Sequence, residues 1–318
     1  MNSLAPLPSP WPLGTILAAV GFTAASRDAL TQAGRMAAGS GEDGEGTTDL
    51  RVLHVVPVEA TESFIMDWPT ANDKEEARMA AIARRDLDGM LIQVLPSRPL
   101  HGNVTVGSPV RETLRAVKAA HADMLVMGLT EHPDRPGAGT LASACLRKAP
   151  TKVLLVRHGH TGPFRTIVAG VDFSDTSRRA LVQAFRMARQ DGAAVHALHA
   201  VCGPWRDPFY RDPTPEAAPE IVRRFKDDLQ RRLEAFVAES SGDTQSVNTT
   251  CAVVDGPSHG EVLARYAREY DADLIVMGTR GRTNLRYVLP GSTAERIVRE
   301  APCSILAVKP EEFSIDID

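Results

Sequence analysis

The chain contains little cysteine, with four in 318 residues and no CxxC pair among them. Zinc sites usually draw on closely spaced cysteine or histidine ligands, and nothing in this sequence has that spacing. Free cysteine in a strand behaves as a small apolar residue, and scattered thiols favour a reducing compartment. We therefore expect no metal site and a cytoplasmic location. The four cysteines are Cys145, Cys202, Cys251 and Cys303.

The chain also has no excess of charge of one sign. Its net charge is −4, and residues 1–156 carry 15 basic and 17 acidic side chains against 21 and 23 in residues 157–318. Nucleic-acid-binding proteins normally show a basic excess or patch. This balance argues against a nucleic-acid partner.

Long hydrophobic runs are lacking as well. The run from Ile16 to Phe22 is far too short to span a bilayer. Residues Met1–Gly14 contain four prolines and no basic residue, which does not fit a secretory signal. We expect a soluble protein without a membrane span.

The common phosphate-binding motifs are missing too. There is no GxxxxGK[ST] P-loop, and no GxGxxG follows a first strand. The most informative stretch is instead Leu274–Gly281, LIVMGTRG, followed after nine residues by Gly291-Ser292-Thr293. The apolar run predicts a buried strand, and a helix is predicted from Thr293 to Arg299. Unpaired amides at that helix start would form a phosphate cradle, although a loop that only joins strand to helix is the alternative.

The spacing G-x2-G-x9-G-[ST], with its flanks, resembles the ATP-binding subclass of the universal stress protein family. The resemblance covers Thr166 to Lys309, in which predicted strands and helices alternate in the order of that family. The predicted elements are a strand from Thr166 to Val171, a helix from Ser177 to Gln190, a strand ending at Ala197–Val201, a charged helix from Pro215 to Glu239, a strand from Val247 to Val254, a helix from Gly260 to Tyr270 and a strand from Cys303 to Val308.

The first half of the chain repeats this pattern. Residues 15–23, 122–128 and 149–156 match residues 166–174, 272–278 and 301–308 at offsets of 151, 150 and 152. Residues 157–163 between the halves are predicted to be a linker. Alternating strands and helices predict an α/β fold with a parallel sheet covered on both faces. We expect two tandem doubly wound, five-stranded domains of the Rossmann-like, adenine nucleotide alpha hydrolase-like type, at residues 1–156 and 165–318.

The two copies differ where chemistry is expected. Asp172 is matched by Gly21, and Gly281 by Glu131. The loop after Gly128 is two residues shorter than its counterpart and contains Asp134 between two prolines. Carboxylates at this place would repel phosphates in a poorly solvated cleft. We expect a degenerate first domain and one working nucleotide site in the second.

The resemblance implies roles for the residues of that site. Asp172 would hydrogen-bond the ribose or base, although capping of the following helix is an alternative role, which Ser174 or Asp175 could also fill. The sequence has Thr293-Ala294 where many family members have Val-Thr, so triphosphate affinity is open to doubt. A magnesium ion with mostly water ligands would fit, but no acidic cluster demands one. The predicted nucleotide-binding residues are Gly170, Val171, Asp172, Ala200, Met277, Gly278, Arg280, Gly281, Gly291, Ser292 and Thr293.

No catalytic residue is predicted. His196 and His199 should point to opposite faces of one strand, so they cannot easily share a metal, and His199 should be a satisfied wall or core residue. Asp255, Ser258 and His259 are too close in sequence to form a triad.

The charged helix from Pro215 to Glu239 places apolar residues at spacings of three and four, which predicts one core-facing stripe. The stripe comprises Ile221, Phe225, Leu229, Leu233 and Phe236.

The leading hypothesis is a regulatory stress-response protein that binds ATP, or else ADP or AMP, and acts on an unidentified protein partner. A scaffold without nucleotide and a slow ATPase are the alternatives. In this family the last strand commonly lies at the dimer interface, so Val153–Val156 and Ile305–Val308 are the expected seam of an internal pseudo-dimer. A homodimer of the whole chain is also compatible with the sequence.

Overall fold

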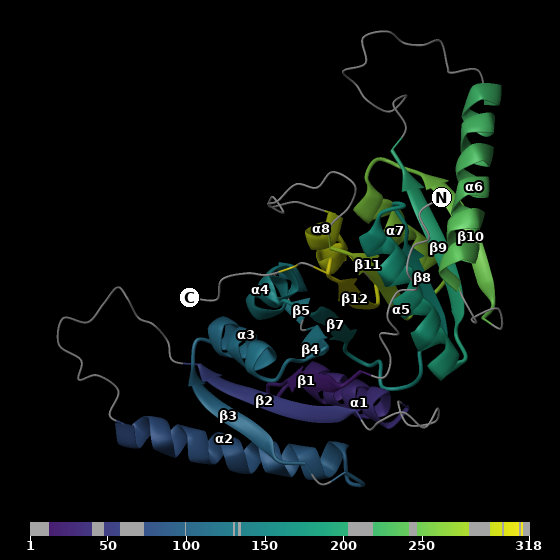
Figure 1. The fold of residues 1–318 in the computed structure, drawn as a ribbon. Coiled ribbons are helices and arrows are strands. Elements are labelled where there is room, and N and C mark those ends of the chain that lie inside the picture. The colour runs from purple at the N-terminus through teal and green to yellow at the C-terminus, as the bar shows by residue number, and fades with distance from the viewer. Residues whose placement is uncertain are drawn as a thin grey trace, which may run out of the picture.

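The fold is seen in a computed structural model that describes residues 13–39, 48–57, 73–98, 100–129, 131–132, 135–202, 219–241, 247–279, 293–300, 302–311 and 313. In this part of the chain, ten strands form one continuous sheet and a further two form a small hairpin. Helices cover both faces of the large sheet (Figure 1). The α/β fold predicted from the sequence is confirmed.

The first half contributes the elements up to residue 157. They are β1 (Thr15–Ala19), α1 (Ala24–Gly39), β2 (Asp49–Pro57), α2 (Asp73–Val94), β3 (Gly102–Gly107), α3 (Pro109–Ala119), β4 (Met124–Leu129), β5 (Glu131–His132), β6 (Arg135–Ala138), α4 (Thr140–Lys148) and β7 (Lys152–Arg157).

The second half repeats this order, and the segment that corresponds to the hairpin lies outside its described residues. Its elements are β8 (Thr166–Gly170), α5 (Asp175–Asp191), β9 (Ala194–Val201), α6 (Pro219–Ser241), β10 (Thr249–Asp255), α7 (His259–Glu269), β11 (Leu274–Gly278), α8 (Thr293–Glu300) and β12 (Ser304–Val308).

The strand order is β10-β9-β8-β11-β12-β7-β4-β1-β2-β3, so each half contributes five strands with the same internal order. Within each half the neighbouring strands are parallel. The halves meet where β12 and β7 pair antiparallel, with Leu306 opposite Leu154. The predicted seam is therefore confirmed. Because these two strands already pair within one chain, a homodimer of the whole chain would need another surface and stays a prediction.

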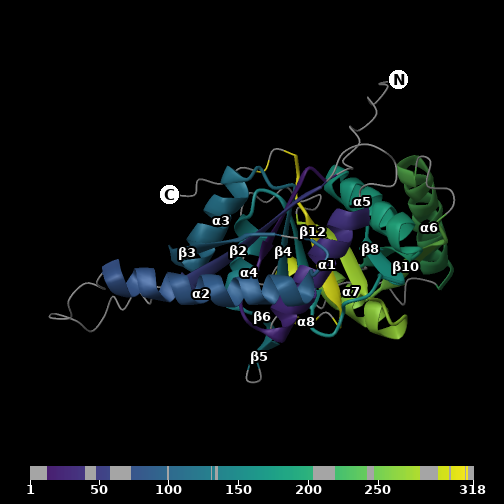
Figure 2. The same cartoon turned by 90° about the horizontal axis from the view of Figure 1, so that it is seen from below.

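The central strands are buried on both faces, which explains their nearly continuous apolar sequences. Leu154 belongs to a core built with residues of α1, α2, α5 and α6, whereas its neighbour Leu155 belongs to a core built with residues of α3, α4, α7 and α8. Figure 2 shows α2, α1, α5 and α6 across one face of the sheet. The two halves thus share two cores rather than having one each.

Polar contacts also join the halves at the seam. The buried Lys309, just after β12, donates from Nζ to the carbonyl oxygens of Leu146 and, at 3.2 Å, Arg147 in the last turn of α4. Carbonyls in the last turn of a helix lack intrahelical donors and carry the negative end of its dipole. At the other end of the β7–β12 pair, where β7 ends and β12 begins, the Arg157 amide donates to Ser304 Oγ at 3.1 Å.

The segment after β4, predicted as a loop, contains the antiparallel hairpin β5–β6 with a register shift between Glu131 and His132. Its strand β6 packs against α8 of the second half. The side chain of Glu131 and the whole of Asp134 lie outside the described residues, so the predicted repulsion of phosphates stays a prediction.

The core-facing stripe predicted along α6 is confirmed for its second part and is wrong at Phe225. Leu233 and Phe236 are buried, Leu229 is half-buried and Phe225 is 41% exposed, whereas the side chain of Ile221 lies outside the described residues. The first turns of α6 extend beyond the strands (Figure 1), so they have no sheet to cover. Among the described residues, none of the helices combines the length and the apolar character needed to cross a membrane.

We predict that Gly128→Ala destabilises the protein by about 1–3 kcal/mol, the usual cost of overpacking. A Cβ at Gly128 would lie 2.6 Å from the carbonyl carbon and oxygen of Ala25, where backbone cannot yield. Gly89→Ala in α2 is the control: its Cβ would meet no atom within 4 Å. That variant should stabilise the protein by about 0.5–1 kcal/mol. Urea unfolding measures both, and shifts of the same sign would contradict the prediction.

A second prediction concerns the seam. Lys309→Met should cost about 1.5–3 kcal/mol, the range for hydrogen bonds to charged groups, because the carbonyls at the end of α4 lose their buried donor. Lys118→Met, at an exposed lysine of α3, should change the free energy of unfolding by less than about 0.5 kcal/mol. Equal losses in the two variants would show that Lys309 does not hold the seam.

Candidate functional site

The candidate site lies at the carboxyl ends of three adjacent strands in the second half. Strand β8 lies between β9 and β11, with Gly170 opposite Leu198 and Ala169 opposite Val276. The helix that follows β8 packs on one face of the sheet, and the helix that follows β11 packs on the other. Such a reversal opens a crevice at the strand ends, where doubly wound folds bind ligands.

Asp172 follows β8 at this crevice. Its Oδ1 accepts hydrogen bonds from the Ser174 amide at 3.0 Å and the Ser174 hydroxyl at 2.5 Å. Ser174 is itself the N-cap of α5, because its Oγ accepts from the Ser177 amide at 3.1 Å. Ser174 therefore fills the capping role considered for Asp172, and Asp172 orients the capping side chain.

Phe173, between these two residues, has an unusual backbone. Its φ of 64° lies in the left-handed region, which costs free energy for any residue with a side chain. Three contacts hold it there: its ring lies 4.5 Å from that of His199, 5.6 Å from that of Phe236 and 4.2 Å from Arg232 Cζ. The corner presents Asp172 at the strand end. It is not predictable from the sequence, because phenylalanine carries no signal for a positive φ.

His199 supports the same corner. Its Nδ1 lies 2.7 Å from the Val171 carbonyl oxygen, so this nitrogen carries the proton and donates. Burial lowers the pKa of His199 more than the Val171 carbonyl raises it, so the ring is neutral at pH 7. The first half has the same device, with His54 Nδ1 2.8 Å from the Val20 carbonyl and its ring 4.4 Å from Phe22. His199 is thus the satisfied wall residue that was predicted.

Gly278, at the end of β11, has a packing role. A Cβ there would lie 2.9 Å from Thr176 Cγ2 and 3.3 Å from the Thr176 carbonyl carbon, so glycine allows the first turn of α5 to approach. Gly128 does the same for α1 in the first half. A phosphate contact by Gly278 stays a prediction, since the close approach of the helix already requires a glycine.

The other predicted residues differ in how far the structure describes them. Gly170 is the last residue of β8 and is half-buried. Val171, Ala200 and Met277 are buried at or near the carboxyl ends of β8, β9 and β11, so their backbone is the part that a ligand could meet. Thr293 begins α8, but its side chain is outside the description. Arg280, Gly281, Gly291 and Ser292 lie outside the described residues, and so do the predicted phosphate contacts.

A hydrolytic triad is not formed beside the crevice. The Ser258 hydroxyl is the N-cap of α7 and accepts from the Glu261 amide at 3.4 Å. His259 faces a thiol instead, with Nδ1 3.8 Å from Cys202 Sγ. His196 points to the other face of the sheet from His199, as predicted, and its ring meets those of Tyr266 and Tyr270. The described residues contain no group of three or more His, Cys, Asp or Glu side chains that could hold a metal ion.

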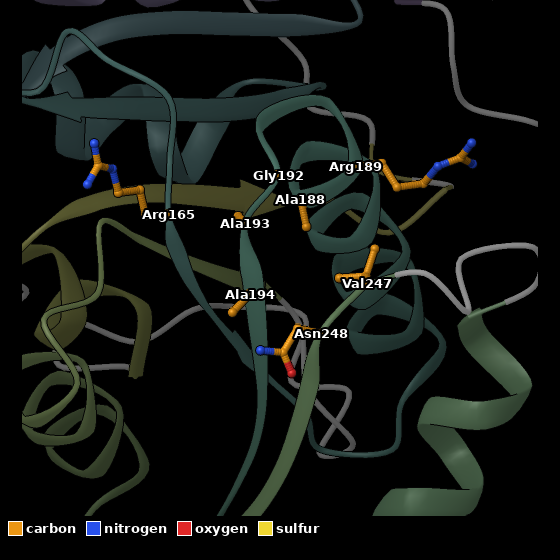
Figure 3. A pocket seen from close by; sticks show the side chains of 8 residues that line it. All are labelled: Arg165, Ala188, Arg189, Gly192, Ala193, Ala194, Val247 and Asn248. Atoms are coloured by element: carbon orange, nitrogen blue, oxygen red, sulfur yellow. The ribbon is translucent and has the colours of Figure 1, made fainter.

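A hollow of about 440 Å³ lies at the opposite edge of the second half, away from this crevice. It is bounded by Arg165, Ala194 and Asn248 around the amino ends of β8, β9 and β10, and by residues at the end of α5. Figure 3 shows Arg165 and Arg189 extending away from each other on opposite sides of it. The two charges do not converge on a common point, so the hollow is not a second candidate for an anion.

Comparison with known proteins identifies the family to which the chain is similar. The sequence profile described as the universal stress protein family matches residues 12–157 and 163–309. "Universal stress protein MJ0531" of Methanocaldococcus jannaschii is 31% identical over 155 residues, which are 49% of this chain and 87% of that protein. A universal stress protein of Thermus aquaticus is 32% identical over 149 residues, 46% of this chain and 99% of that protein.

A solved universal stress protein from Archaeoglobus fulgidus shares the fold over both halves. Its TM-score is 0.63 at 16% identity, covering 94% of this chain and 99% of that one. The family profile is matched twice in succession, over two halves that repeat one arrangement of strands. The chain belongs to the universal stress protein family as a tandem of two of its domains.

Proposed function

We propose that this universal stress protein is a regulatory protein that binds one adenine nucleotide, ATP or its products ADP or AMP, in the crevice between β8 and β11. The observation that carries the proposal is the Asp172-Phe173 corner, in which a positive φ of 64° is stabilised by aromatic packing. Strain retained at the end of a strand, beside a carboxylate, is typical of a ligand site.

In the proposed complex, Asp172 accepts hydrogen bonds from the ribose or the base. Ala200, at the end of β9, offers backbone groups to adenine. The phosphates lie at the start of α8, where helix amides and the dipole favour an anion. Any magnesium ion there would be held mainly by the phosphates and water.

The first half differs from the second in ways that support one nucleotide site per chain. At the position of Asp172 it has Gly21, whose amide donates to Ser26 Oγ at 3.0 Å. Phe22 is not among the described residues with positive φ, and its ring is 45% exposed. The hairpin β5–β6 follows β4 where the second half has the glycine-containing segment. The corner thus differs in this copy, and the different sequence after β4 supports the proposal that its cradle is lost.

A scaffold without nucleotide is the second candidate, and the packing role of Gly278 favours it, because that glycine needs no ligand to explain it. Mass spectrometry of the purified protein separates the candidates, since co-purified adenine nucleotide would argue against a scaffold. For a slow ATPase, no general base has been identified among the described residues of the crevice. A cytoplasmic location is part of the proposal and fits the four free cysteines.

We predict that isothermal titration with ATP and magnesium gives about one site per chain. Gly291→Val should abolish binding by filling the cradle while leaving the circular dichroism unchanged. Gly139→Val is the matched control, because Gly139-Thr140 at the start of α4 corresponds to Gly291-Ser292 just before α8, and a Cβ at Gly139 meets no atom within 4 Å. Two sites, or none, would contradict the proposal.

The role of Asp172 gives a further prediction. Asp172→Ala should weaken ATP binding by roughly 10- to 100-fold, the range for a lost hydrogen bond to a charged group. Asp175→Ala is the control. It removes a carboxylate of the same charge from an exposed position in the first turn of α5, where no contact with the nucleotide is proposed. Equal affinities in these two variants would remove Asp172 from the site.

A further inference from the structure

The second part of α6 packs directly on the Asp172-Phe173 corner. The Phe173 ring lies 5.6 Å from the Phe236 ring in an edge-to-face arrangement, with an interplanar angle of 89°. The Arg232 guanidinium, four residues earlier on the same helix, lies over the Phe173 ring, with Cζ 4.2 Å from the ring centroid. Residues four apart lie on one face of a helix. One face of α6 is therefore in contact with the residue that has the positive φ.

A second set of contacts joins the same end of α6 to the start of α5. Arg178, in the first turn of α5, donates from Nη1 to Ser240 Oγ at 3.1 Å, and its Cζ lies 4.2 Å over the Phe236 ring. The start of α5 is also connected to the corner, because its N-cap Ser174 binds the Asp172 carboxylate. Asp172 is thus linked to the end of α6 on two sides, through Phe173 and through the first turn of α5.

The contacts with α6 matter because the conformation of Phe173 is costly by itself. A positive φ costs free energy in any residue with a side chain, and it persists only where the surroundings determine it. His199 supplies one of the surrounding contacts from β9, and α6 supplies two. The position in which Asp172 is presented therefore depends on the packing of α6.

The first half allows the contribution of α6 to be separated from that of the histidine. Phe22 occupies the position of Phe173, and its ring lies 4.4 Å from that of His54, which corresponds to His199. The ring of Phe22 is nevertheless 45% exposed, and Phe22 is not among the described residues with positive φ. The histidine contact occurs in both halves, so it does not by itself produce the strained corner. The packing of α6 on Phe173 is what accompanies it.

We propose that Phe236 and Arg232 are positioning residues of the nucleotide site, and that they transmit occupancy of the crevice to α6. The inference rests on the proposed function, since the ligand is the adenine nucleotide bound by Asp172. Binding of the nucleotide favours the strained corner, and that corner requires the packed end of α6. Coupling between two sites is reciprocal, so the free energy with which α6 supports binding should also stabilise the packed helix when nucleotide is bound.

Isothermal titration of the full chain with ATP and magnesium tests the positioning role. Phe236→Leu should weaken ATP binding by about 2- to 10-fold, the change that corresponds to the loss of an aromatic pair. Phe225→Leu is the matched control, because it makes the same change on the same helix at a side chain that is 41% exposed. It should leave the affinity for ATP unchanged.

The background Phe173→Gly distinguishes positioning from general packing. Glycine adopts a φ of 64° without the steric cost, so the corner no longer needs support from α6. Phe173→Gly should therefore still bind ATP, and Phe236→Leu in this background should cause no further loss of affinity. A role of Phe236 in the packing of α6 alone would give the same loss in both backgrounds.

Hydrogen exchange measures the reciprocal effect. ATP should slow the exchange of backbone amides in residues 229–241 of the wild-type protein, and this protection should be reduced in Phe236→Leu. Helix α2, the corresponding helix of the first half, is the internal control and should exchange at the same rate with and without ATP. Equal protection of both helices would indicate a general stabilisation of the fold and would contradict the proposal.

The proposal is overturned if Phe236→Leu binds ATP as tightly as the wild type, if it loses the same affinity in both backgrounds, or if Phe173→Gly alone abolishes binding. Any of these results together with binding by the wild-type protein removes the role of α6 and leaves the proposed function standing. A wild-type protein that binds no adenine nucleotide removes the proposed function, and this inference with it. The titration of the wild type thus tells the two failures apart.

Discussion

The antiparallel pairing of β7 with β12 is the contact on which the rest of the structure depends. It joins two five-stranded parallel units into one sheet, so the strands at the centre, buried on both faces, belong to both halves. Each of the two cores runs across the seam, with Leu154 and Leu306 in one and Leu155 and Ile305 in the other. Lys309 adds a buried donor for the end of α4. Neither half could separate without exposing apolar surface from both cores.

The sequence predicted the features that depend on local pattern and repetition. Apolar runs such as LIVM at Leu274 identified the buried strands, and the constant offset between the halves predicted the duplication and the seam. Features that depend on tertiary contact were missed. The positive φ of Phe173 is stabilised by His199 and Phe236, which are remote in sequence. The apolar spacing of α6 could not show that Phe225 would be 41% exposed, because the spacing does not tell how far the sheet extends under the helix.

The candidate site illustrates the same division. The glycine spacing predicted a phosphate cradle after β11, but it could not separate a glycine needed by a phosphate from one needed by a helix. Gly278 and Gly128 both allow the first turn of a helix to approach the strand, so packing alone explains a glycine at this position in both halves. Asp172 and Gly21 differ at a place where packing imposes no such requirement, which makes that pair the more informative sign of divergence between the halves.

Covalent fusion across the seam has an evolutionary and physical consequence. In a dimer of two identical subunits, every substitution appears twice, so a change that suits one crevice is forced on the other. Here each half can change alone, as Asp172 in one half and Gly21 in the other show, while β6 of the first half packs against α8 of the second. The effective concentration of one half near the other is set by the tether rather than by expression level. Such a molecule can therefore keep an asymmetric pair assembled even when the cell makes very little of it.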